Sequence, residues 1–566
     1  MSNKQAVWDM IILAVIGMLF FGLFLGSYHL ITPDEGRYVE VAREMFVSHN
    51  FITPHLDGTV FLDKPILYYW LESACIKLLG VSEWSVRLVP AIFGLIGVLF
   101  NYWAGYKLYN RRTGFISALV LMTMLLYFLT AHYADMDLMV AVLMEIALWL
   151  FIVAIRLPKP GVQRDITLWC AYAVAALAFL TKGLMGLVFP AMIIGAWILL
   201  LSRWRVITQM RLASGLFLFI VLVAPWYTAV QYANPEFFNY FFIVQQFSRY
   251  TTSGFNAQQP LYFYFVVIVV GIFPWTIFLF QSLFYTFKQL RYTWKKADIE
   301  LFLLLWVFLI LIFFSIPKSK IVGYIIPVFP PLALLIAHYL SEHWGKLRGS
   351  KNLLWSMIAF LILSAALAFS LIYTAHLNSI ATSASFNFLC SMAVIISAGA
   401  VFTLWLVVAR YSFRKVFLAM ILVTMVMDII GAASAKTYKL NNVKPLAIKL
   451  RQLLKPGDEV ATFNKYYQDL PVYINRTVYV VDNWQDSSIA LNDTWRRELA
   501  EGIIYKHKQQ PLLISYQEFS QLWNSKAHRL FVLTSSHKVA QLKGIVHSPV
   551  YQLGHFDGTV LLSNQD

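Results

Sequence analysis

Long apolar runs separated by short polar segments dominate the sequence. The first run, Trp8 to Ile31, contains one charged residue, Asp9, near its start. A helix needs roughly 20 consecutive apolar residues to cross a bilayer, and about 13 runs of this kind follow one another along the chain. They lie near residues 8–31, 86–106, 114–131, 136–155, 168–184, 186–201, 212–231, 262–287, 300–316, 321–341, 354–375, 386–409 and 416–433. The pattern predicts an all-α polytopic membrane protein.

Basic residues gather in alternate loops between these runs. The loops with three or four Lys or Arg each are 107–113, 156–165, 202–211, 288–298, 342–351 and 410–415. Because Lys and Arg collect in cytoplasmic loops, we expect the N-terminus in the cytoplasm. The loops 32–85 and 232–261 then lie on the outer side as interfacial segments.

The composition changes near Lys436. Residues 1–435 form the predicted membrane domain, whereas 436–566 are charged and rich in turn residues. Within that second part, a helix is predicted at 444–454 and strands at 458–463 and 477–481. An odd number of crossings places this small soluble α/β domain outside as well.

The overall composition agrees with a membrane protein and limits the partners. The chain of 566 residues is 59% hydrophobic and 13% charged, against about 25% charged residues in ordinary domains, and its mean hydropathy is +0.64. The net charge of +16 is explained by basic cytoplasmic loops, so the expected partner is the bilayer and not nucleic acid. The three cysteines, Cys75, Cys170 and Cys390, are far apart and show neither metal-ligand spacing nor a disulfide framework.

The first outer segment, "ITPDEGRYVEVAREMF", begins directly after the first apolar run. Thr32 is a good N-cap, Pro33 suits the first helical position, and Glu35 completes a capping box. A helical projection of 33–47 puts Arg37, Glu40 and Arg43 on the polar side and Asp34 on the apolar stripe. This predicts an amphipathic helix along the outer membrane surface. A carboxylate among apolar groups is costly unless paired, so Asp34 is the first candidate functional residue.

The second outer segment, "FLDKPILYYWLESACIKLLG", predicts a helix from Pro65 to a C-cap at Gly80. Asp63 is equally consistent with an N-cap and with a site residue. Lys64 has no capping role, because a cation is unfavourable at a helix N-terminus. A lysine there, close to free backbone N–H groups, indicates an anionic ligand such as phosphate.

Further charged and polar residues fall on the same outer side. Asp137 lies just inside the fourth predicted helix, and Lys182 lies in a break between apolar runs, where snorkelling is an equally good interpretation. The other candidates are Gln246, Arg249, Lys318, Lys320 and Tyr324. A few acids among several cations at a membrane surface is the pattern of a site for a lipid-borne phosphate.

The order of these motifs resembles the lipid A 4-amino-4-deoxy-L-arabinose transferases, which are GT-C glycosyltransferases related to protein O-mannosyltransferases. The similar features are PDE-x-R-Y, then D-K-P, the acid of "YADMD", T-K-G, an aromatic segment with arginine, and "FSIPKSK" followed by tyrosine. The resemblance covers essentially the whole chain. It implies transfer of a sugar from undecaprenyl phosphate to lipid A at the periplasmic face of the bacterial inner membrane, by a monomer.

The resemblance also implies roles for individual residues. Asp34 would be the catalytic or acceptor-positioning acid, Asp137 would orient sugar or acceptor, and Lys64 would hold a phosphate. The carrier phosphate would be held by Arg249, Lys318, Lys320 and Tyr324. Glu35, Arg37, Asp63, Lys182 and Gln246 complete the set of expected substrate-binding residues.

Two positions depart from the family. The aminoarabinose transferases have Glu-Lys-Pro where this chain has Asp63, and a histidine in the aromatic segment where Gln246 stands here. In the family those two side chains together hold a metal. A neutral amide is a poor zinc ligand, so no metal is predicted, although a divalent cation stays an alternative. The changed pair also leaves open transfer of a hexosamine or hexose, or a protein O-mannosyltransferase activity.

Overall fold

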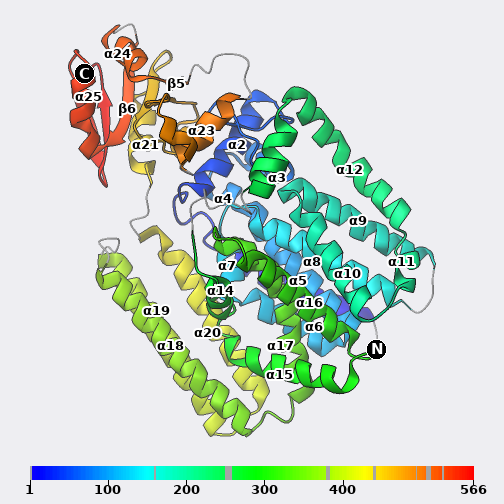
Figure 1. Cartoon of the computed structure of the whole chain (residues 1–566). Coiled ribbons are helices and arrows are strands. Elements are labelled where there is room, and N and C mark those ends of the chain that lie inside the picture. Colours follow the sequence, from blue (N-terminus) through cyan, green and yellow to red (C-terminus); the bar gives the residue numbers. More distant parts are fainter. Residues whose placement is uncertain are drawn as a thin grey trace. The chain divides into compact units, whose positions relative to one another are not determined.

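The computed structural model describes residues 3–157, 161–248, 258–377, 383–437, 442–491, 494–504, 512–525 and 528–566 (Figure 1). The chain divides into two compact units. The first comprises Met1–Tyr28, Arg87–Pro225 and Gln259–Lys439, and the second comprises His29–Val86, Trp226–Gln258 and Leu440–Asp566. The outer loop 32–85 and most of 232–261 thus fold in the same unit as the C-terminal segment.

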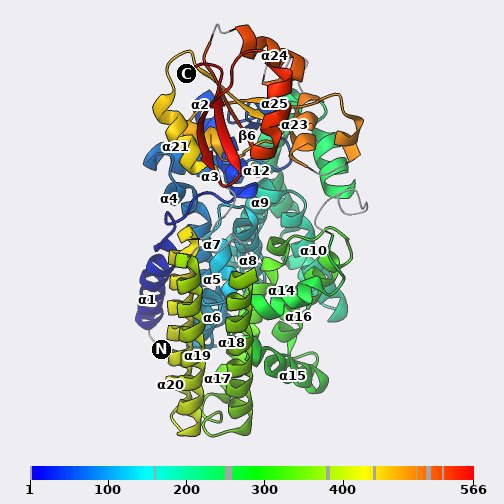
Figure 2. The same ribbon diagram turned by 90° about the vertical axis from the view of Figure 1, so that its left-hand side faces the viewer.

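The first unit is built from helices. They are α1 (Asn3–Gly22), α5 (Leu88–Leu108), α6 (Arg111–Met122), α7 (Leu125–Ala131), α8 (Asp137–Ile155), α9 (Val162–Lys182), α10 (Met185–Leu200), α11 (Arg205–Gln209), most of α12 (Leu212–Ala233), α14 (Phe263–Gly271), α15 (Thr276–Thr293), α16 (Asp298–Ser315), the 3₁₀ helix η2 (Val322–Val328), α17 (Phe329–His343), α18 (Lys351–Leu377), α19 (Ser383–Val408), α20 (Phe413–Ser434) and the 3₁₀ turn η3 (Ala435–Thr437). The last three long helices, α18, α19 and α20, lie side by side (Figure 2).

Each predicted apolar run corresponds to helical structure. Among the described residues, ten helices are long and apolar enough to cross a membrane, or up to twelve if each bent pair is one span. The bent pairs are α6 with α7, at 65°, and α14 with α15, at 110°, while α10 is a shorter apolar helix. The first run was predicted to continue to Ile31, which is wrong: α1 ends at Gly22 and Phe24 has a left-handed φ of 64°.

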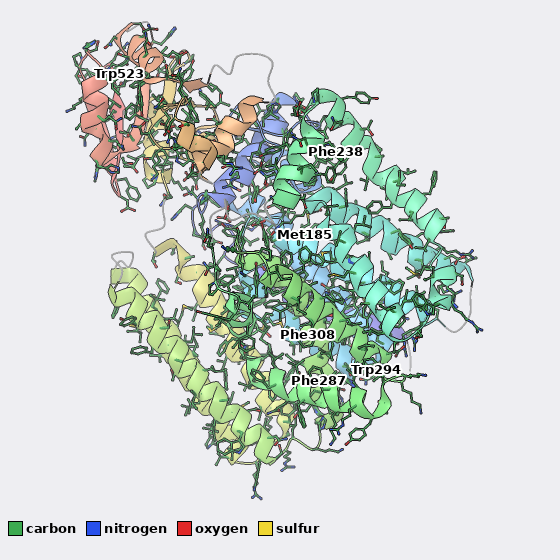
Figure 3. The ribbon with its side chains drawn as sticks, viewed as in Figure 1. Met185, Phe238, Phe287, Trp294, Phe308 and Trp523 are labelled. Atoms are coloured by element: carbon green, nitrogen blue, oxygen red, sulfur yellow. The ribbon has the colours of Figure 1, made fainter. Side chains whose placement is uncertain are left out.

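The helix α8 is the centre of the first unit. Of its apolar span, 89% is buried, and it packs against α5, α9, α10 and η2. The polar residue at the start of this helix, Asp137, is buried as well. Other helices present aromatic side chains outward; Phe287 and Phe308, with ring centroids 6.2 Å apart, are examples (Figure 3).

The second unit combines the outer segments with a mixed sheet. Its helices are α2 (Asp34–Ser48), α3 (Leu67–Leu79), α4 (Glu83–Val86), the π-helix η1 (Asn239–Ser248), α21 (Lys444–Leu453), α22 (Leu470–Ile474), η4 (Ser487–Leu491), α23 (Trp495–Ile504), α24 (Tyr516–Ser525), η5 (Ser536–Lys538) and α25 (Val539–Ile545). Its strands are β1 (His55–Leu56), β2 (Thr59–Val60), β3 (Glu459–Phe463), β4 (Tyr479–Val481), β5 (Leu513–Ile514), β6 (Leu530–Ser535), β7 (Tyr551–Phe556) and β8 (Thr559–Ser563).

Six of these strands form one sheet in the order β5-β4-β3-β6-β8-β7. The strands β5, β4, β3 and β6 are parallel to one another, and β8 runs antiparallel to both of its neighbours, β6 and β7. Trp523 of α24 is buried in the core of this sheet (Figure 3). The predicted helix at 444–454 and the strands at 458–463 and 477–481 are confirmed as α21, β3 and β4.

Two hairpins of this unit share one turn chemistry. The turn between β1 and β2 is Asp57–Gly58, with φ of 49° and 75°, and the turn between β7 and β8 is Asp557–Gly558, with φ of 45° and 74°. A two-residue hairpin turn of type I′ requires positive φ at both central positions, which Asp-Gly accepts. The carboxylate of Asp57 also accepts a 2.8 Å hydrogen bond from the N–H of Val478, which attaches the first hairpin to the sheet.

Candidate functional site

The helix α2 begins close to where the sequence predicts. Glu35 is fully buried, and its Oε2 accepts a 2.7 Å hydrogen bond from the N–H of Ile31. In the predicted capping box Glu35 would reach back to the N–H of Thr32, whereas this contact goes to Ile31, one residue earlier. Glu35 therefore has a structural role at the start of α2, through Ile31 and not as the capping box predicts. The residue directly before the helix is Pro33 rather than Thr32, a difference of one position at a helix end.

The expectation that α2 has a solvated polar face is wrong. Glu40 and Arg43, which the projection placed on that face, are at most 2% exposed. They form a buried ion pair in which Arg43 Nη2 lies 2.6 Å from Glu40 Oε1. The cause is that α3, β1 and α22 pack around α2 within the second unit, which a projection of the helix alone cannot include.

The guanidinium of Arg37 is the centre of a group of acids. Its Nε lies 2.8 Å from Glu498 Oε1 of α23, and its Nη2 lies 3.7 Å from Asp34 Oδ1. Burial alone would lower the pKa of Arg37, but the charges of Glu498, Asp34 and Asp63 reverse this and raise it. The side chain of Asp34 is 44% exposed, so it is not enclosed by apolar groups as predicted. The structure instead pairs the carboxylate of Asp34 with Arg37.

A second polar group surrounds Asp63. The hydroxyl of Tyr240 donates a short hydrogen bond to Asp63 Oδ1, and Nε2 of Gln245 donates to the same oxygen at 3.2 Å and to Tyr240 Oη at 2.8 Å. Tyr240 and Gln245 share a face because η1 is a π-helix, in which residues five apart are stacked. The glutamine that faces Asp63 is therefore Gln245. Its neighbour Gln246, which the family resemblance placed opposite Asp63, is half-buried.

Tyr69 of α3 was not expected from the sequence. Its hydroxyl is fully buried and makes no hydrogen bond within the described part of the chain. Burial raises its pKa well above the ordinary value; the charge of Asp63 adds to this rise and that of Arg37 opposes it. A neutral phenol beside these groups can donate one hydrogen bond to a ligand. Only the unusual "YYW" after the Asp63 motif could have drawn attention to it.

The residues at Asp63 do not fit a tight metal site. Oδ1 of Asp63 already accepts two hydrogen bonds, and its partners are a phenol and a neutral amide rather than an imidazole. Across the described ranges, no three His, Cys, Asp or Glu side chains are grouped so that they could hold a metal ion.

In the first unit, three predicted residues from separate motifs meet. Lys182 at the end of α9 forms an ion pair with Asp137 at the start of α8, and both side chains are 7% exposed. The Nζ of Lys182 also lies 4.5 Å from the ring centroid of Tyr324 in η2. Gly323 lies against the carboxylate of Asp137, where a Cβ would overlap it. A glycine is thus needed for this close approach.

The lysines before η2 have different environments. Lys320 is 3% exposed, and its Nζ donates to the carbonyl oxygens of Gln259, at 2.9 Å, and Pro317. The side chain of Lys318 is exposed, while its carbonyl accepts a 3.0 Å hydrogen bond from the N–H of Gln259. Lys320 therefore fixes the loop that presents Lys318. Lys64 of the second unit is half-buried, and Arg249 lies outside the described residues.

Each unit, described by itself, contains a polar centre. The centre in the second unit pairs Asp34 and Glu498 with Arg37 and adds Asp63, so it can place a carboxylate beside a hydroxyl or phosphate acceptor. The centre in the first unit is a buried cation over an aromatic ring beside a carboxylate, which suits a phosphorylated or hydroxylated ligand.

Known proteins are similar to this chain in sequence. A family model described as dolichyl-phosphate-mannose-protein mannosyltransferase matches residues 63–228. The undecaprenyl phosphate-alpha-4-amino-4-deoxy-L-arabinose arabinosyl transferase of Yersinia enterocolitica is 29% identical over 371 residues, which are 62% of this chain and 64% of that protein. The protein of the same name from Aeromonas hydrophila is 31% identical over 367 residues, 62% of this chain and 65% of that protein. The matched region is less than two thirds of the length of either relative.

Solved structures share the fold. ArnT from Cupriavidus metallidurans bound to undecaprenyl phosphate has a TM-score of 0.85 and 22% identity, with 100% of this chain and 98% of that chain covered. The archaeal oligosaccharyltransferase AglB from Archaeoglobus fulgidus has a TM-score of 0.51 and 12% identity, with 99% and 74% covered. The resemblance carried by the sequence motifs is confirmed, and so is the predicted polytopic fold with a small C-terminal α/β part.

Proposed function

We propose that this chain is a membrane glycosyltransferase that moves 4-amino-4-deoxy-L-arabinose from undecaprenyl phosphate to lipid A. The observation that carries the proposal is the meeting of Asp137, Lys182 and Tyr324, which come from three separate motifs of the transferase pattern. The relatives named for this transfer and the fold of a protein solved with undecaprenyl phosphate support the same activity.

The roles of the residues are those that the family resemblance implies, combined with the side-chain environments where the structure describes them. Asp34, beside Arg37, receives or positions the acceptor. A phosphate acceptor is already ionised near neutral pH, so Asp34 then positions it and does not remove a proton. Lys64 holds a phosphate, and Asp137 with Lys182 orients the sugar or the acceptor. Tyr324, Lys318 and Arg249 hold the carrier phosphate, with Lys320 fixing the loop that carries Lys318.

The proposed location follows from the alternate basic loops. The chain is a multi-pass protein of the bacterial inner membrane with a cytoplasmic N-terminus, and it acts as a monomer. Both outer loops and the C-terminal sheet are then periplasmic, which is where a carrier-linked sugar and lipid A are both accessible. No nucleotide-sugar site is required for such a reaction, because the donor is the carrier lipid.

One observation supports a second candidate, transfer of a different sugar. Asp63 is one methylene shorter than the glutamate of the aminoarabinose transferases, and its partner is the neutral Gln245. A site built to hydrogen-bond a particular hydroxyl or amine discriminates strongly against analogues that lack it. A hexosamine or hexose donor would therefore use the same scaffold with these two residues changed. The family model over 63–228 supports a third, protein O-mannosylation.

The test is mass spectrometry of lipid A from cells with and without the chain, and with Asp34→Asn. An added pentosamine that disappears with Asp34→Asn supports the proposal. An added hexose or hexosamine identifies the second candidate, and label on exported protein identifies the third. If lipid A and protein are unchanged in all three strains, the transferase proposal is refuted.

A further inference from the structure

The parallel strands of the C-terminal sheet reverse their winding between β3 and β6. From β3 the chain proceeds to β4 and then to β5 on one side, and it returns to pair β6 with β3 on the other side. In open α/β sheets, ligands bind outside the carboxyl ends of the strands at such a switch point, because the two loops that follow leave in opposite directions.

A cavity of about 230 Å³ lies at this switch point. Its walls come from the loop after β3, from Ser535 at the end of β6, from His537 in η5, from Asp557 in the β7–β8 turn, and from Thr32. Cavities for drug-sized ligands measure about 300–1,000 Å³. The space therefore suits a smaller ligand, of the size of a single sugar ring.

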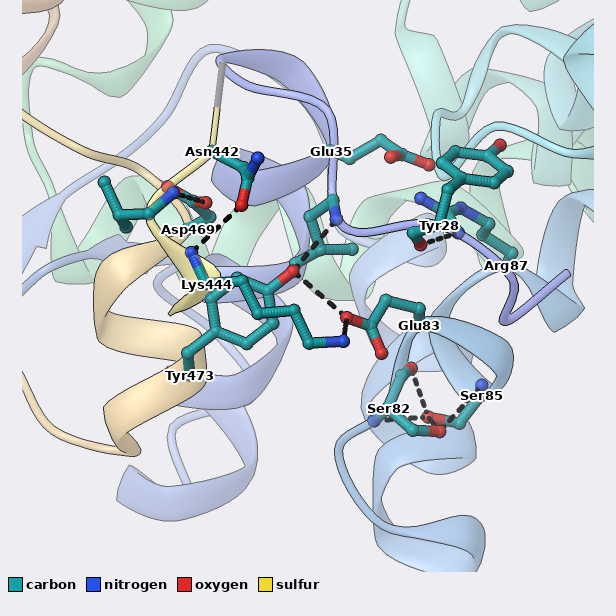
Figure 4. Close-up of polar contacts among 12 residues, drawn as sticks. Tyr28, Glu35, Ser82, Glu83, Ser85, Arg87, Asn442, Lys444, Asp469 and Tyr473 are labelled. Atoms are coloured by element: carbon teal, nitrogen blue, oxygen red, sulfur yellow. Dashed lines mark hydrogen bonds and ion pairs between the residues drawn. The ribbon is translucent and has the colours of Figure 1, made fainter. Parts of the chain in front are cut away.

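Asp469 at the end of the loop after β3 gives the cavity an unsatisfied acceptor. Its side chain is fully buried, and Oδ2 accepts a 3.1 Å hydrogen bond from the N–H of Val443 (Figure 4). Oδ1 has no hydrogen-bond partner among the residues described. Leaving a buried acceptor without a hydrogen bond is unfavourable, so a donor from a ligand would be stabilising.

The charges around the cavity do not favour an anion. Lys465 lies 4.7 Å from the ring centroid of Tyr467 and is acted on by Asp469 and Asp557. The lining thus contains the carboxylates of Asp469 and Asp557 and the ammonium group of Lys465, together with His537. A phosphate would meet two acids there, whereas hydroxyl groups can donate to the acids and accept from the lysine. The chemistry indicates a neutral polyhydroxylated ligand.

We propose that this cavity binds the ring of a neutral sugar, with a ring hydroxyl donating to Asp469 Oδ1. The sugar has two possible sources with the same chemistry, a free monosaccharide or the outermost sugar of a glycolipid. Thr32 lines the cavity directly before Pro33 and Asp34, so a bound ring also contacts the segment that leads to the candidate acid. The inference does not depend on the proposed transferase activity.

The experiment is saturation-transfer-difference NMR with the full chain in detergent micelles. The probes are D-glucose, D-galactose, D-mannose and N-acetyl-D-glucosamine, each with rough lipopolysaccharide as competitor. Losing one hydrogen bond weakens binding about tenfold, so Asp469→Asn should lower the affinity by that factor. Asp557→Asn, in which asparagine accepts the positive φ, should also weaken binding. Asp486→Asn, outside the cavity, is the matched control.

The outcomes separate the sources. Binding of a free sugar that both cavity variants weaken supports a soluble ligand. Saturation transfer to the outer sugar of lipopolysaccharide alone, again lost in both variants, supports a glycolipid. The proposal is overturned if the wild-type chain binds none of these probes, or if both variants bind as the control does. In Asp469→Asn the amide oxygen can still accept the hydrogen bond from Val443, and thermal unfolding checks that this variant is folded. If Asp469→Asn does not fold, Asp557→Asn still tests the proposal.

Discussion

Lys182 and Asp137 form an ion pair although they end one helix and begin another, and both are almost fully buried. The Nζ of Lys182 lies over the ring of Tyr324, and the carboxylate of Asp137 lies next to Gly323. Buried charges of this kind are tolerated only when paired. The arrangement therefore links three separate sequence motifs through one interaction.

The first prediction concerns this pair. Lys182→Met should destabilise the chain by roughly 3–5 kcal/mol, because it leaves Asp137 charged and buried without its partner. The double variant Asp137→Asn with Lys182→Met should recover most of the apparent melting temperature in detergent but no transfer. A double variant as unstable as the single one would contradict the pairing, and a fully active one would contradict a role in the reaction.

The second prediction concerns Asp34. Asp34→Asn should reduce transfer by about 10²–10⁴-fold if the carboxylate accepts a proton from a hydroxyl acceptor, and less if it only positions an ionised phosphate. Turnover is measured with purified chain and carrier-linked sugar, with melting temperature as the check on folding. Glu44→Gln, on the same helix, serves as control. Turnover close to that of wild type would remove Asp34 from the site.

The third prediction uses the neighbouring glutamines. A chain with Asp63→Glu and Gln245→His should retain more zinc after dialysis than wild type, because η1 directs position 245 at residue 63 and imidazole is a strong zinc ligand. Asp63→Glu with Gln246→His is the matched control and should retain no more than wild type. Metal content is measured by mass spectrometry. Greater retention by the second variant would show that position 246 faces the carboxylate.

The fourth prediction concerns Gly36 of α2. A Cβ at this position would lie 2.8 Å from the backbone nitrogen of Asp469 and 2.9 Å from the carbonyl carbon of Gln468. Gly36→Ala should therefore lower stability by about 1–3 kcal/mol, the usual cost of overpacking. Gly544→Ala, where a Cβ meets nothing within 4 Å, should be neutral or stabilising. Equal melting temperatures for the two variants would refute the close approach.

The fifth prediction concerns pH. Burial raises the pKa of Asp469 from 3.8 to about 7, although Val443 opposes the rise. Because the folded chain holds this proton more tightly than the unfolded chain, stability from this group is full below about pH 4. It is lost as the pH rises towards 7. Hydrogen exchange at β3 and β6 of the full chain should be slower at pH 5 than at pH 8 after correction for intrinsic rates. Asp469→Asn should remove most of that difference; an unchanged difference would assign it to other groups.

Much of the fold follows from patterns that the sequence states directly. Apolar runs locate the helices of the first unit, because a helix in lipid must satisfy its backbone internally and cover itself with apolar side chains. The break at Phe24 and the bends between α6 and α7 and between α14 and α15 were not predicted. They occur inside runs that remain apolar, so hydropathy carries no sign of them.

The sequence predicted which residues belong to the candidate site better than it predicted the contacts between them. Asp137, Lys182 and Tyr324 were each selected because they were polar at one membrane face, and the structure brings them together. Glu498 and Tyr240 were missed because both come from segments distant in sequence from their partners Arg37 and Asp63. Burial of Glu40 with Arg43 was missed because the helix was considered without its neighbours.

The π-helix η1 has a consequence for comparing this chain with others. In an α-helix, side chains three or four apart are stacked, whereas here the stacked pair is Tyr240 and Gln245. A homologue with one residue fewer between these positions could form an ordinary α-helix and keep both side chains directed at Asp63. Alignment columns and spatial positions would then differ by one residue in this segment. Homologues should therefore be compared by superposed side chains, since an equivalent column number can belong to a residue that faces elsewhere.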